Sequence, residues 1–117
     1  MRYIILIILL LNILYADALY NRGEYLYFSK ACSSCHGPSA EGSSSTPKLA
    51  RKSQKYLSKK LNDFKNGKFF NQTQEMMSQF AQALQSDDIE ALSYFLATHK
   101  DEEVLEIDDN LLGGFGS

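Results

Sequence analysis

Hydrophobic residues recur at helical spacing in four segments between Leu19 and Lys100, and no segment shows the strict alternation expected of a half-buried β-strand. The first segment predicts a helix over roughly Leu19–Cys32. A stretch rich in Gly, Ser and Pro follows from Gly37 to Pro47 and predicts a loop. The pattern therefore indicates an all-α fold of about four helices.

Three further helices have boundary signals of their own. Ser53 is a good N-cap for the second, and Asn66-Gly67 should end it. The third is expected over about Gln72–Leu84. The fourth should be capped by Ser86 and end near Lys100. The predicted buried stripe of this last helix consists of Ile89, Leu92, Phe95 and Leu96.

The N-terminus has the three parts of an export signal. Met1-Arg2 is positive, Tyr3 to Tyr15 is almost wholly apolar, and Ala16-Asp17-Ala18 offers small residues at the spacing of a cleavage site. We expect residues 1–18 to be a signal peptide and 19–100 to form one exported domain. The alternative is a retained membrane anchor, but the apolar run is shorter than the roughly 20 residues that span a bilayer. We therefore expect a periplasmic protein without stable membrane insertion after cleavage.

Charge is distributed unevenly along the chain. The net charge of −2 argues against a nucleic-acid partner. Lys48–Lys68 holds eight basic residues and one acid, whereas Asp87–Asp109 holds nine acids and one base. The basic segment is either a solvated helix face or a surface that docks acidic patches on a partner protein. Residues 101–117 form an acidic, Gly-ending tail.

Both cysteines, Cys32 and Cys35, stand in a C-x-x-C-H sequence that ends at His36. A structural zinc site normally needs four ligands, and the other histidine, His99, is far away in sequence. A redox dithiol of the thioredoxin type belongs to a fold with alternating strands and helices. Covalent haem attachment needs two thiols and a histidine in this order. This chemistry suits an exported helical chain and supplies apolar core that a small domain lacks.

A haem iron held by His36 leaves a sixth coordination position. Methionine and histidine are the usual ligands for electron transfer. We expect His99 to be a surface residue, because it lies at a helix end among charged neighbours. The residues themselves leave Met76 and Met77 open as candidates, because a methionine in an apolar stripe is also a common packing residue.

Three ordered blocks resemble a known family, the class I cytochromes c of the small bacterial single-haem type. The blocks are "GEYLYFSKACSSCHG", "TPKLARKSQKYLSKKLNDFKNGK" and "MSQFAQALQSDDIEALSYFLATHK". Together they cover roughly Tyr20 to Lys100 and are more specific than the C-x-x-C-H sequence alone.

The resemblance implies a small cytochrome c fold wrapped around one covalently bound haem c. It implies thioether bonds from Cys32 and Cys35, His36 as the proximal ligand of the iron, and Met77 as the distal ligand, with Met76 as its packing neighbour or alternative.

It also implies two structural details. The loop before "KLA" should supply a backbone carbonyl to the proximal imidazole, and Pro47 is the candidate. Phe28 falls where the family has an aromatic at the crossing of the first and last helices, packed on Tyr94 or Phe95. The glycine of this crossing, Gly23, stands one residue further from the haem-binding cysteines than the family pattern.

The resulting functional prediction is a periplasmic electron carrier and not an enzyme. One electron would pass by outer-sphere transfer, with redox proteins as partners. Two alternatives stay open at this point. One is a haem enzyme or gas sensor with a labile sixth ligand. The other is an accessory haem subunit of a larger redox complex, with the tail as its tether.

Overall fold

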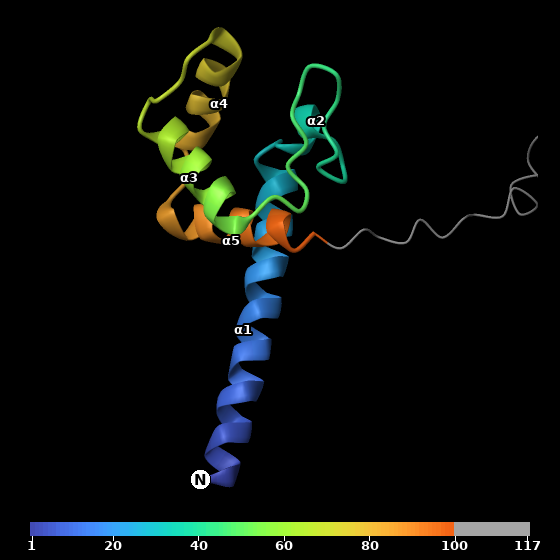
Figure 1. Ribbon diagram of the computed structural model, residues 1–117, viewed down its shortest axis with the longest axis vertical. Helices are drawn as coiled ribbons and strands as arrows, with labels where there is room; N and C mark the ends of the chain where they lie inside the picture. Colours follow the sequence, from blue (N-terminus) through green and yellow to red (C-terminus); the bar gives the residue numbers. More distant parts are fainter. Residues whose placement is uncertain (100–117) are drawn as a thin grey trace, which may run out of the picture.

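The computed structural model describes residues 1–99, which contain helices and no strand. The predicted all-α fold is therefore confirmed for this part of the chain, whereas the acidic tail (101–117) and Lys100 lie outside it. The helices are α1 (Arg2–Ser29), α2 (Ser33–His36), α3 (Gln54–Lys65), α4 (Gln72–Gln82) and α5 (Ser86–Ala97). In Figure 1, α5 runs across α1, and α3 and α4 stand beside this crossing on the side opposite α2.

Helix α1 is longer than the sequence predicted. It begins at Arg2 and not at Leu19, so it runs without a break through the predicted cleavage site. Its first half projects away from the rest of the molecule, and the large apolar side chains from Tyr3 to Tyr15 are all more than half exposed (Figure 1). By length and composition alone α1 is apolar enough to cross a membrane, a test that a signal sequence also passes.

The cap of α3 was predicted correctly, and that of α5 was not. The Ser53 side chain accepts a hydrogen bond from the Tyr56 N–H (3.2 Å), as expected of an N-cap. The N-cap of α5 is Gln85 and not Ser86. Gln85 and Asp88 accept hydrogen bonds from each other's backbone N–H, which forms a capping box. Helix α5 then ends at Ala97, three residues before the predicted end.

The core lies where α1 crosses α5. Gly23 allows the close approach, because a Cβ at this position would overlap the backbone oxygen of Ala91 and the Cβ of Phe95. Phe95 packs on Tyr20 and Tyr27, with ring centroids 5.0 and 5.7 Å away. The predicted stripe of α5 is buried here, with exposed fractions from 1 to 4% for Ile89, Leu92, Phe95 and Leu96.

The aromatic of α1 at this crossing is Tyr27, so the assignment to Phe28 was wrong. Tyr27 is completely buried, whereas 48% of Phe28 is exposed. Tyr27 lies four residues after Gly23 and therefore on the same helix face. The additional residue before Cys32 is accommodated after the helix ends, where Ala31 adopts a left-handed conformation (φ 61°).

Candidate functional site

The C-x-x-C-H element forms a turn directly after α1 and continues into the short helix α2. The Cys32 N–H donates to the Tyr27 carbonyl oxygen (3.0 Å), and the His36 N–H donates to that of Cys32 (3.0 Å). Both thiols are free. Cys32 is partly buried, which raises the pKa of its thiol, whereas Cys35 is exposed. The turn thus presents two thiols and one imidazole within five consecutive residues.

The His36 imidazole is buried and oriented by a backbone carbonyl. Only 5% of His36 is exposed, and its Nδ1 lies 2.9 Å from the Pro47 carbonyl oxygen, the bond that the resemblance implied. A carbonyl oxygen only accepts, so Nδ1 must carry the proton. The other ring nitrogen, Nε2, makes no hydrogen bond with the described residues and keeps its lone pair for a metal.

The loop after α2 is fixed to the core by a second side chain, Tyr27. Its hydroxyl donates to the Gly37 carbonyl oxygen (2.5 Å), and burial raises the pKa of this hydroxyl. The Gly42 N–H donates to the His36 carbonyl oxygen (2.8 Å), which closes the loop. Tyr27 therefore connects the helix crossing with the residue that follows His36. The resemblance points to the adjacent Phe28 and does not reveal this role, although the four-residue spacing from Gly23 to Tyr27 contains the signal.

Helix α4 carries the two candidate methionines. Met77 is partly buried and lies in the proximity of His36, whereas 54% of Met76 is exposed. The buried Ser78 hydroxyl donates to the Phe64 carbonyl oxygen (2.6 Å) and so attaches α4 to the end of α3. His36 and Met77, which are far apart in the sequence, lie near each other.

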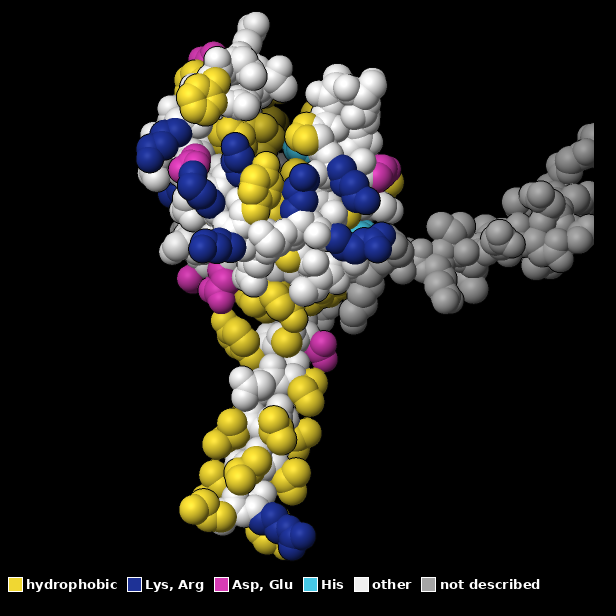
Figure 2. Space-filling view, in the orientation of Figure 1, with side chains coloured by type: hydrophobic (Ala, Val, Ile, Leu, Met, Phe, Trp, Pro, Cys, Tyr) yellow, Lys and Arg dark blue, Asp and Glu magenta, His cyan; other side chains and the backbone are white. Residues whose placement is uncertain are grey.

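The space between α2 and α4 is open on one face of the molecule. Figure 2 shows a hollow between the two upper lobes, with hydrophobic side chains in its floor and a histidine beside them. Large apolar side chains are also exposed along α4 and the segment before it: Phe69 (39%), Phe70 (91%), Met76 (54%) and Phe80 (50%). Free thiols, an imidazole with an available Nε2 and an apolar hollow fit a covalently bound haem.

The second histidine occupies a different setting from the predicted one. His99 is only partly exposed, and its ring lies edge-on against Phe95, with centroids 5.4 Å apart. Its Nδ1 is buried without a hydrogen-bond partner within residues 1–99. The expected exposed surface position is therefore wrong, since packing on Phe95 turns the ring inward.

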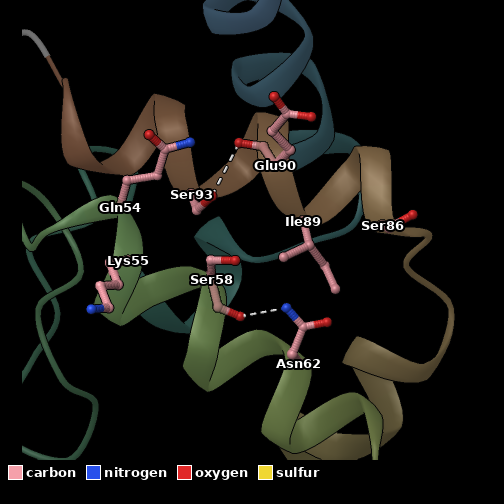
Figure 3. Close-up of a pocket in the computed structure, with 8 residues that line it drawn as sticks. All are labelled: Gln54, Lys55, Ser58, Asn62, Ser86, Ile89, Glu90 and Ser93. Carbon is pink, nitrogen blue, oxygen red and sulfur yellow. Dashed lines mark hydrogen bonds between the residues drawn. The ribbon is translucent and has the colours of Figure 1, made fainter.

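A separate pocket of about 500 Å³ lies between α3 and α5. Figure 3 shows its lining, in which Ile89 is joined by polar residues that include Lys55 and Asn62 from α3 and Glu90 and Ser93 from α5. The Ser93 hydroxyl and the Asn62 amide each donate to a carbonyl oxygen of their own helix. None of the cysteines, histidines or methionines lines this pocket, and we do not assign it to the site.

The comparisons with known proteins agree with this geometry. The cytochrome c family model matches residues 20–100. The chain is 33% identical to a thiosulfate dehydrogenase electron acceptor from Stutzerimonas stutzeri over 77 residues (65% of this chain, 36% of the relative). It is 32% identical to cytochrome c4 from Azotobacter vinelandii over 83 residues (68% and 40%). It is also 33% identical to the cytochrome subunit of sulfide dehydrogenase from Chlorobaculum tepidum over 75 residues (64% and 64%).

These alignments span 36 to 64% of the relatives' lengths, so they describe one domain and not the whole of each relative. The family match covers the helix crossing, the C-x-x-C-H element and the α4 methionines together. The chain therefore belongs to the cytochrome c family.

Proposed function

We propose that this protein is a one-electron carrier that holds a single haem c through Cys32 and Cys35, with His36 and Met77 as the axial ligands of the iron. The observation that carries the proposal is the pairing of a buried, carbonyl-oriented His36 with Met77. When bound, the haem supplies an iron that cycles between the ferric and ferrous states. Two protein ligands leave no open position for a substrate, which favours a carrier over an enzyme.

The chain's own residues set the properties of this centre. The Pro47 carbonyl fixes the His36 tautomer and strengthens the imidazole as a ligand. The Tyr27 hydroxyl donates to the carbonyl oxygen of Gly37, the residue after His36, and so restricts movement of the C-x-x-C-H turn. A methionine sulfur favours the ferrous state, so a reduction potential above that of bis-histidine sites is expected.

We further propose that residues 1–18 direct export and are removed after Ala18, which places the mature protein in the periplasm. Cleavage there removes the exposed apolar half of α1. It keeps Leu19 and Tyr20, which pack against the core. The N-terminal sequence of the mature protein, read by mass spectrometry, tests this site. A full-length chain recovered with the membrane fraction would instead mean a retained anchor.

Redox proteins are the expected partners. Two of the relatives are described as an electron acceptor and as a cytochrome subunit of dehydrogenases of sulfur compounds. By analogy, we propose that this chain accepts electrons from a dehydrogenase, and that the Lys48–Lys68 basic face docks an acidic patch of the partner. The association rate should then fall as salt rises, because screening weakens exposed charge pairs.

An absorption spectrum of the matured protein tests the ligand assignment. We expect a covalent, low-spin c-type spectrum with the weak ferric band of methionine ligation, unchanged when carbon monoxide is added to the reduced protein. Rapid carbon monoxide binding would favour a haem enzyme or gas sensor, and an absence of covalent haem would return Cys32 and Cys35 to dithiol chemistry.

A matched pair of variants separates the two methionines. Met77→Ala should remove the methionine band and admit carbon monoxide, whereas Met76→Ala should leave both unchanged. The opposite result would assign the distal ligand to Met76.

A further inference from the structure

One side of α3, together with the residue before its N-cap, carries a compact cluster of lysines. We call Lys52, Lys55, Lys59 and Lys60, together with the half-exposed Tyr56 between them, the α3 basic face. The Nζ atoms of Lys52 and Lys60 lie 5.3 and 5.9 Å from the centre of the Tyr56 ring. Figure 2 shows several of the dark blue side chains gathered around a hydrophobic one on the visible face of the molecule.

Most of this positive charge is not neutralised within the described residues. The ion pairs there are Arg22–Asp88 and Lys59–Asp63 (2.9 and 2.6 Å). Lys52, Lys55 and Lys60 take part in neither of them. Four ammonium groups therefore face one carboxylate over a helix about 18 Å long, and the face favours a negatively charged occupant.

The end of α5 lies beside the start of this face. The Arg51 N–H donates to the Leu96 carbonyl oxygen near the end of α5 (2.8 Å), and Lys52 follows directly. Six acids and no base then occur between residues 101 and 109. Residues 101–117 can reach about 55 Å when extended, so they are long enough to cover the whole of α3.

We propose that the acidic segment 101–109 of this chain binds the α3 basic face of the same molecule. The charges are complementary, and the tether gives the segment an effective concentration in the millimolar range without any further contact. Each exposed pair contributes little, and salt screens it. The resulting contact is reversible and depends on ionic strength.

This inference extends the proposed function, because the same face is the proposed docking surface for an acidic redox partner. The bound tail would compete with the partner and lower its association rate. Neutralising the six acids would change the formal net charge from −2 to +4 and leave the face open. The tail would thus discriminate between redox partners, because only a partner that displaces the tail reaches the α3 basic face.

NMR of the mature, reduced holoprotein (residues 19–117) tests the contact without any partner. The test variant carries D101N, E102Q, E103Q, E106Q, D108N and D109N. Spectra are recorded at ionic strengths of about 0.01 M and 1 M, where the screening lengths are about 30 and 3 Å. We expect the backbone amides of residues 52–60 to differ between wild type and variant at low salt, and to coincide at high salt.

The double variant Glu24→Gln/Glu75→Gln is the control, because it removes two exposed carboxylates outside the tail. It should leave the amides of residues 52–60 unchanged. Identical low-salt spectra of wild type and test variant would overturn the proposal. Shifts that grow with protein concentration would also overturn it, because they would assign the tail to a second copy.

This result is separable from the proposed function. The amide shifts report contact between the tail and α3 even if no redox partner docks there. The carbon monoxide experiment reports the iron ligands whether or not the tail binds. A faster, more salt-dependent reaction of the tail variant with an acidic electron donor would show that the contact controls access.

Discussion

Protein side chains cover the crossing of α1 and α5, whereas they leave the surface along α4 partly uncovered. At the crossing, Gly23, Tyr27 and Phe95 pack closely and are buried. Along α4, half of the Met76 and Phe80 surface is exposed, and Met77 is only partly covered. Protein packing alone completes the first region, whereas the second presents apolar groups that a haem in the neighbouring hollow would partly cover.

The difference indicates how the fold and the site depend on each other. The crossing fixes α1, and the C-x-x-C-H turn begins directly where α1 ends, so the rigid region positions the incomplete one. Tyr27 belongs to both, because its ring packs on Phe95 and its hydroxyl holds Gly37. Substitutions can disturb first the crossing, then this connection, and finally the helix ends.

Gly23→Val should have the largest effect. The new side chain would overlap the Ala91 backbone and force the helices apart, at a cost of about 3 kcal/mol or more in the free energy of unfolding. Denaturant unfolding of the holoprotein measures this cost. Gly67→Ala is the control. It meets no atom within 4 Å but has a positive φ of 76°, so its cost should stay near 1 kcal/mol. Equal losses would contradict the tight crossing.

Tyr27→Phe should remove the hydrogen bond to Gly37 and keep the packing of the ring on Phe95. The Gly37 carbonyl oxygen would lose its hydrogen bond, which should cost about 1–2 kcal/mol in unfolding free energy. The reduction potential should shift as well, because the turn that holds His36 becomes less constrained. Tyr25→Phe, at a side chain that is 70% exposed, is the matched control and should change neither quantity. A stability loss without any shift in potential would limit the Tyr27 hydroxyl to stabilising the fold.

Asp88→Asn tests the start of α5 and its pH dependence. A hydrogen bond from the Gln85 N–H, followed by the Arg22 ion pair, holds the pKa of Asp88 below 3.8. The carboxylate therefore stabilises the fold above about pH 4, and this contribution is lost as the pH falls through the lowered pKa.

At neutral pH the Asp88→Asn substitution should cost about 1 kcal/mol, and the difference from wild type should shrink toward pH 3 in thermal unfolding. Asp87→Asn, in the same first turn but outside the capping box, should cost less. A difference that grows on acidification would refute this assignment.

Ala31→Gly should have the smallest effect on the free energy of unfolding, and it should stabilise the fold where the other substitutions destabilise it. Ala31 is exposed and has a left-handed conformation (φ 61°) that glycine adopts without strain, so we expect a gain of about 0.5–1 kcal/mol. Ala40→Gly is the comparison. Its φ is also positive (53°), but its methyl group is fully buried, so the gain should be offset by lost packing. Thermal unfolding of both variants measures the difference.

The sequence by itself determined the helical class, the family, the α3 cap and the residues of the haem-binding turn. These features are local. Apolar spacing, a capping serine before a helix, and the two thiols and one imidazole of C-x-x-C-H can all be recognised in the sequence without knowing what packs against them. The buried stripe of α5 was also predictable, because its amphipathic pattern is regular.

Only the tertiary structure decided which aromatic enters the crossing, where α1 begins and ends, and how His99 is placed. Tyr27 and Phe28 are adjacent and chemically similar. The choice between them depends on the face that Gly23 turns toward α5, and on a left-handed Ala31 that accommodates one additional residue. The proximity of His36 and Met77 likewise joins segments that are far apart in the sequence, and a hydrogen bond from Ser78 attaches the helix that carries Met77 to α3. Contacts between segments far apart in the sequence make these choices, and local propensity does not contain them.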